Sequence, residues 1–287
     1  MTINLGYACI NTTINCTSNK TFRLNSYSEE RLKKTIEENL NCLDKIIEWN
    51  YKNEIKFFRI GSGLIPFASH EICKFNWQDF YKKEFKKIGN KIKKYKIRVS
   101  MHPDQFVVLN SPTKSIVEKS IKEIEYHCDV LDLLGIGSDG KITLHVGGMY
   151  GNKEEAIERF ISNYNGLSKR IKERIVIEND DKIYTVDDCL YINKKTRVPV
   201  VFDYFHNECN PIKKVNYTKI IKTWKKKDGN PIFHYSDQLE GGRKGSHSLT
   251  IDVKEYKKFK KEIKKYNMDL MLEVKDKELS VLKVKNV

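Results

Sequence analysis

The chain has 287 residues, which is long for an ordinary domain but usual for one α/β barrel. Its 39% hydrophobic residues suffice for a large core, and no apolar run approaches the roughly 20 residues of a membrane span. The 53 Lys and Arg against 38 Asp and Glu give a net charge of +15, which favours a polyanionic partner. An AT-rich genome, which raises the lysine content, would explain the same charge without any partner.

The cysteines indicate the compartment. There are seven, scattered along the chain and with no C-x-x-C pair. A disulfide framework is therefore not expected, and a reducing environment fits best. The first ten residues lack the basic region followed by an apolar stretch that marks a signal peptide. We expect a cytoplasmic protein that is not associated with a membrane.

Short apolar runs alternate with helical patterns along the chain. The predicted elements are strand Ile3–Ala8, a helix with the apolar stripe Leu32, Ile36, Leu40, Leu43 and Ile47, strand Ile55–Ile60, helix Asn76–Tyr95, strand Ile97–Met101, helix Ser115–Leu134, strand Ile142–His145, helix Lys153–Lys172, strand Ile175–Glu178, helix Val186–Asn193, strand Val198–Asp203, helix Tyr217–Lys226, strand Pro231–Tyr235, helix Val253–Tyr266 and strand Asp269–Glu273. Most strands are continuous apolar runs, as in parallel sheets that are buried on both faces. Eight strands and seven helical segments predict one (β/α)8 TIM barrel, with residues 1–287 as a single domain.

Imidazoles and carboxylates gather where these strands end. Six of the seven histidines, all except His127 in a predicted helix, lie at or after the carboxyl end of a strand, together with three acids. The residues concerned are His70, His102, His145, Glu178, Asp203, His206, His234, His247 and Glu273. Strand ends converge at one mouth of a barrel, so we expect these side chains to be neighbours.

The acids and imidazoles expected at the barrel mouth predict bound metal ions. Three carboxylates would repel one another if all were ionised, and divalent cations remove that repulsion. Nine potential ligands suit two or three ions, and imidazole with carboxylate suits Zn²⁺, Mn²⁺, Fe²⁺ or Co²⁺. Two neighbouring ions can stabilise both the attacking and the leaving oxygen of a phosphodiester, so hydrolysis is the predicted chemistry. Any one of these histidines taken alone would more often be a core or surface group than a ligand.

Several segments resemble the UV damage endonuclease family, from about residue 3 to residue 280. They are LGYACIN, RIGSGLIPFASH, SMHPDQFVVLNSP, LHVGGMYGNKEEA, IENDD, FDYFHN, FHYSDQ, GSHS and LEVKDKE. The family has an α/β barrel. The resemblance implies a divalent-metal enzyme, often supported by manganese, with Mg²⁺, Co²⁺ or Zn²⁺ as alternatives. It would nick damaged double-stranded DNA immediately 5′ of UV photoproducts, leave a 3′-hydroxyl and need no ATP. We expect a monomer that acts on DNA in the cytoplasm.

The resemblance also implies roles for individual residues. The metal ligands would be His102, His145, Glu178, Asp203, His206, His234, His247 and Glu273. Glu178 would bridge two ions, His102 with His145 would hold one, Asp203, His234 and Glu273 a second, and His206 with His247 a third. His70 would be a ligand or would touch the scissile phosphate. Some members of the family carry Lys where this chain has Ile232, so any role of that lysine is absent here or is filled by another group.

Three further pairs are candidates for substrate contacts. By resemblance, Gln105 and Phe106 would probe the helix at the damaged dinucleotide, since an aromatic ring can stack on bases and photodimers are poorly stacked already; Phe106 could instead begin a core segment. Tyr7 and Asn11 match family positions near the active site, although Tyr7 could be plain core. The two cations of GGRKG, Arg243 and Lys244, could bind phosphate or lie in an ordinary surface loop.

Other functions remain open for such a barrel. An AP endonuclease would cut abasic DNA, and a sugar isomerase would have no affinity for DNA. A binding module with structural metals would hold damaged DNA without cutting it. Chelation separates the last class from the enzymes, because EDTA would abolish incision but would leave electrostatic binding intact.

Overall fold

The computed structural model describes residues 2–287 and contains a closed barrel of eight parallel strands. Each strand pairs with the next in sequence, and β1 pairs with β8 to close the ring. The strands are β1 (Ile3–Cys9), β2 (Phe57–Ile60), β3 (Arg98–Met101), β4 (Lys141–His145), β5 (Ile175–Glu178), β6 (Val200–Asp203), β7 (Ile232–Tyr235) and β8 (Met268–Leu272). The predicted (β/α)8 barrel is confirmed, and every strand lies within two residues of its predicted bounds.

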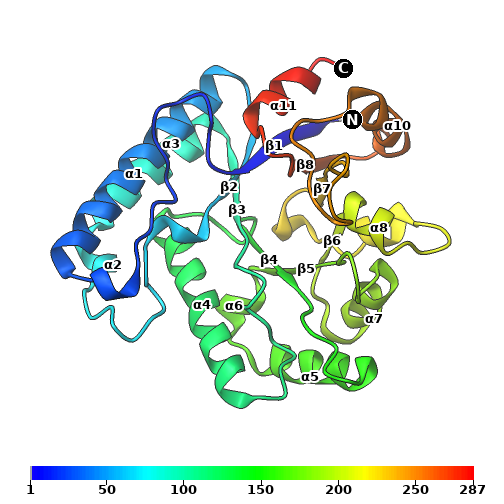
Figure 1. Cartoon of the computed structure of the whole chain (residues 1–287), viewed down its shortest axis with the longest axis horizontal. Coiled ribbons are helices and arrows are strands. Elements are labelled where there is room, and N and C mark those ends of the chain that lie inside the picture. Colours follow the sequence, from blue (N-terminus) through cyan, green and yellow to red (C-terminus); the bar gives the residue numbers. More distant parts are fainter. Residues whose placement is uncertain (1) are drawn as a thin grey trace.

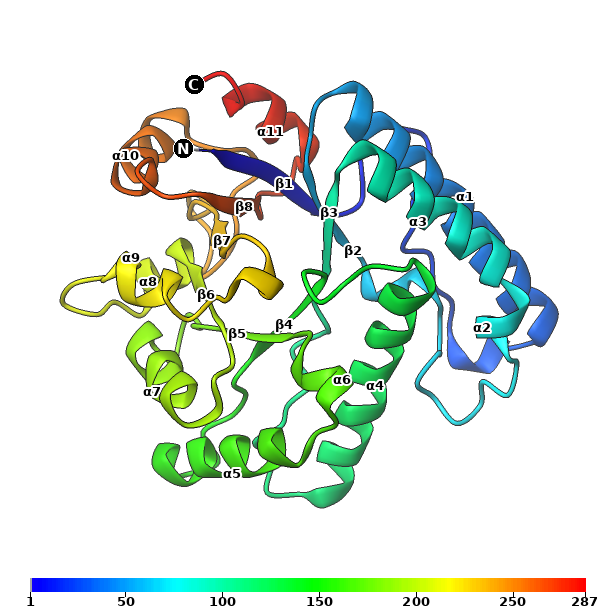
Figure 2. The same cartoon turned by 180° about the vertical axis from the view of Figure 1, so that it is seen from behind.

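Helices surround the strands in both views (Figures 1 and 2). The α-helices are α1 (Glu29–Lys52), α2 (Trp77–Phe80), α3 (Lys82–Tyr95), α4 (Lys114–Leu133), α5 (Lys153–Gly166), α6 (Lys169–Lys172), α7 (Val186–Thr196), α8 (Tyr204–Cys209), α9 (Tyr217–Ile221), α10 (Val253–Ile263) and α11 (Glu278–Val284). Short 3-10 turns cover Leu24–Ser26, Ser62–Leu64 and Lys226–Asp228. The amino and carboxyl ends of the chain lie near each other, beside α10 and α11 (Figure 1).

The first helix illustrates why the sequence folds in this way. Ser28 caps α1, since its side chain accepts a hydrogen bond from the Arg31 amide, and Glu29 and Glu30 follow in the first turn, where negative charge is favourable. The predicted apolar stripe is buried in the main hydrophobic core, which lies between the helices and the barrel.

Several helix boundaries differ from the predictions. The predicted helix Asn76–Tyr95 is divided at Tyr81, and Lys153–Lys172 is divided where Ser168 caps the separate helix α6. Two short helices were not predicted. In α8, the side chain of Asp203 accepts a hydrogen bond from the His206 amide and starts the helix directly at the strand end. The other, α11, follows β8 and supplies the eighth helical unit.

One pair of cysteines corrects the expectation of fully reduced thiols. Cys16 and Cys42 form a disulfide that joins the loop after β1 to α1, while Cys9, Cys73, Cys128, Cys189 and Cys209 are free. The two partners are 26 residues apart, and only the path of the loop along α1 brings them together. Sequence spacing alone contains no signal for this pairing.

Within the described residues 2–287, no helix is long and apolar enough to cross a membrane.

Candidate metal centre

The alternation of side chains along the strands positions the site. Successive residues of a strand point to opposite faces, so residues two apart share a face. A small apolar cluster, separate from the main core, contains Phe57, Val176, Val201, Ile232 and Met271, each from a different strand. The residues two positions further on are Arg59, Glu178, Asp203, His234 and Glu273. The barrel interior therefore has an apolar layer with a charged layer directly above it, at the carboxyl ends of the strands.

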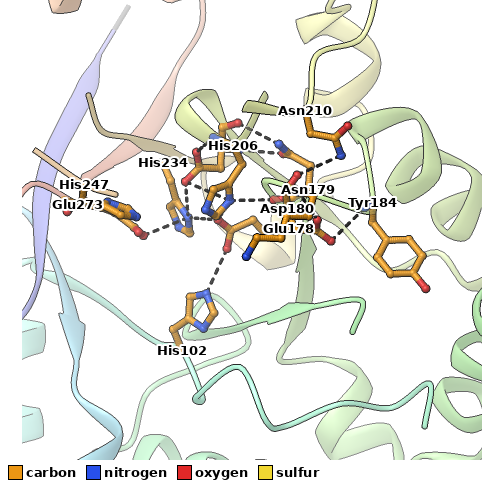
Figure 3. Close-up of polar contacts among 12 residues, drawn as sticks. His102, Glu178, Asn179, Asp180, Tyr184, His206, Asn210, His234, His247 and Glu273 are labelled. Atoms are coloured by element: carbon orange, nitrogen blue, oxygen red, sulfur yellow. Dashed lines mark hydrogen bonds and ion pairs between the residues drawn. The ribbon is translucent and has the colours of Figure 1, made fainter. Parts of the chain in front are cut away.

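Glu178 is the centre of the charged layer (Figure 3). Its carboxylate is 1% exposed, with Oε2 lying 3.1 Å from Nε2 of His102. The other oxygen, Oε1, lies 3.0 Å from Nδ1 of His234 and 3.2 Å from Nδ1 of His206. Residues from three strand ends and from α8 thus meet on one carboxylate.

Two groups of side chains present ligand atoms close enough together to hold an ion. One consists of His102, His145 and Glu178, and the other of Glu178, Asp203 and His234. In each group, one ligand atom from every residue lies within 4.8 Å of the others. Glu178 belongs to both groups, so it can bridge two ions with its two oxygens.

Glu273 extends the second group. Its Oε1 lies 3.3 Å from Nδ1 of His234 and 2.6 Å from a guanidinium nitrogen of Arg59. Burial raises the pKa of Glu273, but Arg59 and His234 outweigh burial and lower it below its usual value. Glu273 is therefore held as a carboxylate at the edge of the group.

The electrostatics show an excess of negative charge. Burial raises the pKa of Asp203 to about 6, and the neighbouring Glu178 and Glu273 carboxylates add to this effect. Burial lowers the pKa of His206, but Asp203 and Glu178 outweigh it and raise the value to about 11. At Glu178 the histidines overcome burial and hold the pKa well below its usual value. The acids thus hold His206 in its charged form, and negative charge that attracts positive charge in this way favours bound cations.

Unpartnered atoms test whether a divalent ion fits. In the part of the chain that the structure describes, the buried atoms Nδ1 of His145 and Oδ2 of Asp203 have no hydrogen-bond partner. Such atoms are costly to bury unless something binds them. Imidazole nitrogen and carboxylate oxygen are the ligands that Mn²⁺, Zn²⁺ and Co²⁺ accept, so the residues present fit a divalent ion.

His206 and His247 lie at the side of these groups. The His206 ring is 5.6 Å from that of His145 and 6.4 Å from that of His247, between ring centroids. Nδ1 of His247 lies 3.0 Å from the carbonyl oxygen of Glu273. The two rings are near each other, as a third ion would require, but they join neither of the two groups described above.

Asn179 supports the site from behind. Its side-chain nitrogen donates to the backbone carbonyl of Asp203, and its side-chain oxygen accepts from the backbone amide of Asp203. The backbone carbonyl of Asn179 lies 2.9 Å from Nδ1 of His206. This double contact locks the end of β5 to the end of β6. In the segment IENDD, Asn179 directly follows the predicted ligand Glu178, and this position was the available signal for its role.

The structure does not bring Tyr7, Asn11 and His70 to the carboxylates. Tyr7 is fully buried, and its hydroxyl donates to Asn50 of α1 and accepts from Asn11. This corresponds to the core alternative for Tyr7. The exposed His70 accepts a hydrogen bond from the Ile72 amide. Among residues 2–287, no hydrogen bond or ion pair links these three side chains to the acids of the mouth.

A pocket of about 750 Å³ adjoins the ligands. It is lined by Gln105 and Phe106 of the loop after β3, by His145 and His206, and by Tyr150. Phe106 is 78% exposed, so it is not a core residue. The predicted probe residues and two predicted ligands therefore share one hollow, and Tyr150 is a lining residue that was not predicted.

Arg243 and Lys244 are exposed in the loop after β7. The side chain of Gln238 holds this loop, because it donates to the Arg243 carbonyl and accepts from the Gly245 amide. Gly245 also lines the pocket beside His206. The loop that carries both cations therefore borders the pocket.

Arg59 is the functional candidate that sequence reasoning missed. It contributes a guanidinium, with its side chain 7% exposed, to the same layer as the ligands. A single charged residue inside the apolar strand FFRI was the available signal. Ile232 is in the apolar layer below, and Arg59 is a buried cation that contacts an acid of the mouth.

Fold and site together define a (β/α)8 barrel enzyme with candidate metal-binding groups at the carboxyl ends of its strands. The chain belongs to the UV-endonuclease UvdE family, whose sequence profile matches residues 3–286. A UV DNA damage endonuclease from Clostridium perfringens is 44% identical over 99% of this chain and 70% of its own length. A second UV DNA damage endonuclease, from Bacillus mycoides, is 35% identical over 99% of this chain and 94% of its own length.

Solved structures agree with this assignment. The crystal structure of SacUVDE has 44% sequence identity and a TM-score of 0.94, covering 98% of this chain and 96% of that one. A putative sugar phosphate isomerase/epimerase from Anabaena variabilis has a TM-score of 0.58 at 10% identity, and the match covers 96% of this chain and 85% of that one. The second likeness concerns the barrel fold alone.

Proposed function

We propose that this protein is a DNA repair endonuclease that nicks double-stranded DNA immediately 5′ of UV photoproducts and leaves a 3′-hydroxyl. The observation that carries the proposal is one carboxylate, Glu178, shared by two ligand groups beside a pocket whose rim carries the exposed Phe106. The two relatives that match 99% of this chain are UV DNA damage endonucleases.

The two ligand groups support the proposed positions of the ions. His102 and His145 would hold one divalent ion and Asp203 with His234 a second, with Glu178 between them, Glu273 beside the second, and His206 with His247 as a third position. Bound divalent ions, Mn²⁺ foremost, would lower the pKa of a bound water and stabilise charge on the phosphoryl oxygens. Glu178, Asp203 and Glu273 would orient those ions, and the buried walls would exclude other water.

The pocket supports the proposed substrate contacts. Phe106 would stack where the damaged bases leave the helix, and Gln105 would fill the gap. The pocket of about 750 Å³ has room for extruded bases within reach of the ligand groups. Arg243 and Lys244 would contact the phosphate backbone, which positions the strand without reading sequence.

The reaction needs no ATP in this proposal, and the protein acts as a monomer in the cytoplasm. A lesion-specific nuclease is favoured over an AP endonuclease because an exposed aromatic ring shares a pocket with the ligands. A sugar isomerase is disfavoured because the likeness to such enzymes is confined to the fold at 10–16% identity.

The test is nicking of supercoiled plasmid with Mn²⁺, before and after UV irradiation. We expect relaxed circles only from irradiated plasmid, and none when EDTA is present. Equal nicking of unirradiated plasmid would remove the lesion-reading claim. Binding of irradiated DNA without any nicking would favour the binding-module alternative.

A further inference from the structure

Arg59 brings a permanent positive charge into the layer of predicted ligands. It lies on β2, two residues after Phe57 of the apolar layer, and its side chain is 7% exposed. One guanidinium nitrogen, Nη2, lies 2.6 Å from Oε1 of Glu273 and 2.9 Å from Nε2 of His234. Its Nε is buried without a hydrogen-bond partner within residues 2–287. A buried guanidinium thus contacts two residues of the predicted metal centre.

The contact with His234 determines which ring nitrogen carries the proton. A guanidinium can only donate, so Nε2 of His234 accepts. The proton of the neutral ring is then on Nδ1, which donates to Oε1 of Glu178 at 3.0 Å. Both ring nitrogens of His234 therefore have partners. To bind His234, an ion would have to displace either Arg59 from Nε2 or the proton from Nδ1.

The charges lead to the same conclusion. Glu178, Asp203 and Glu273 bring three negative charges to the layer, and Arg59 neutralises the one on Glu273. The group of His102, His145 and Glu178 has no such contact with Arg59 in the described chain. The two ion positions therefore differ in the charge that already surrounds them.

We propose that Arg59 is a resident cation that satisfies Glu273 and His234 when no ion is bound and competes with one divalent ion for them. It is a positioning residue, and it makes the position at Asp203, His234 and Glu273 weaker than the position at His102, His145 and Glu178. This inference rests on the metal centre of the proposed function.

The experiment compares the intact wild-type protein with Arg59→Gln. Mn²⁺ binding is titrated through the electron paramagnetic resonance signal of the free ion, and Tm is measured in EDTA and in saturating Mn²⁺. We expect two unequal classes of sites in the wild type. In Arg59→Gln the dissociation constant of the weaker class should fall roughly tenfold or more, because a like charge has been removed. Its Tm should drop in EDTA, and Mn²⁺ should raise it by several degrees more than in the wild type.

The matched control is Arg174→Gln. Arg174 is equally buried, with 7% side-chain exposure, and pairs with Asp132 away from the mouth. This variant should lose stability equally in EDTA and in Mn²⁺, as any purely structural arginine would, and should bind Mn²⁺ as the wild type does. The double variant with Arg59→Gln and Glu273→Gln should regain part of the Tm lost in EDTA, because no unpaired carboxylate remains.

Each outcome either supports or overturns the proposed competition between Arg59 and the ion. Unchanged or weaker Mn²⁺ binding by Arg59→Gln would overturn the competition, while the metal centre itself would stand. A wild type that binds no Mn²⁺ would overturn the proposed function together with this inference. If Arg59→Gln does not fold, Arg59→Lys replaces it: lysine keeps the charge but cannot hold both partners, so a smaller gain in affinity is expected, and no gain overturns the proposal.

Discussion

Glu178 is the residue on which the two ligand groups depend. It is fully enclosed, and its two oxygens face histidines from different strands, His102 on one side and His234 on the other. The neighbouring Asp203, at the same depth, has its pKa raised to about 6 by burial and by the carboxylates around it. The histidines hold Glu178 ionised, while Asp203 and Glu273 add negative charge beside it. Nearby cations stabilise such a group of acids.

Glu178→Gln should reduce Mn²⁺ binding and lower kcat on irradiated DNA by roughly 10³-fold or more, because the bridging charge is lost while the volume is kept. Isothermal titration with Mn²⁺ and single-turnover nicking measure the two effects. Asp269→Asn is the control, since Asp269 pairs with Arg98 at the opposite end of the barrel. It should lower stability and leave Mn²⁺ stoichiometry unchanged. Full activity of Glu178→Gln would contradict the bridging role.

Phe106→Ala should weaken lesion discrimination. Stacking on a base contributes about 1–3 kcal/mol, so the ratio of nicking on irradiated and unirradiated plasmid should fall roughly tenfold. Metal content should not change. Phe80→Ala is the matched control, because Phe80 is 55% exposed on α2 and should leave the ratio intact. A loss of bound metal in Phe106→Ala would indicate a structural role instead.

At the scale of elements, the strands could be predicted and some connections could not. Continuous apolar runs located all eight strands, and the residues at their ends located the mouth. The helix α8 is too short for a periodic pattern, so His206 was placed after a strand rather than on a helix. Arg59 was not predicted as a site residue. A single charged residue inside an apolar strand does not reveal its function until its partners, Glu273 and His234, are known.

The disulfide is a second feature that only the fold reveals, and it has a measurable consequence. Closing a loop of 26 residues restricts the unfolded chain, which corresponds to about 3 kcal/mol in the free energy of unfolding. The variant with Cys16→Ser and Cys42→Ser should therefore be less stable than the wild type in urea under oxidising conditions. The difference should vanish in dithiothreitol. Equal midpoints under oxidising conditions would show that the bond does not form.

At the scale of the whole molecule, the net charge of +15 bears on DNA binding. If the positive surface neutralises six to ten phosphates, affinity for undamaged duplex should fall by roughly 10³- to 10⁵-fold between about 50 and 200 mM salt. Fluorescence anisotropy on an undamaged oligonucleotide measures the slope. A flat response would assign the charge to lysine-rich helix surfaces without a nucleic-acid role, as the composition alone allows.

We propose that the carboxyl ends of the strands deliver acids and imidazoles to one divalent-metal site. Crystals soaked in Mn²⁺ test it most directly, through the anomalous scattering of manganese. We predict anomalous peaks on both sides of the Glu178 carboxylate, one within ligand distance of His102 and His145 and the other of Asp203 and His234. Peaks elsewhere, or none at Glu178 in saturating Mn²⁺, would contradict the account.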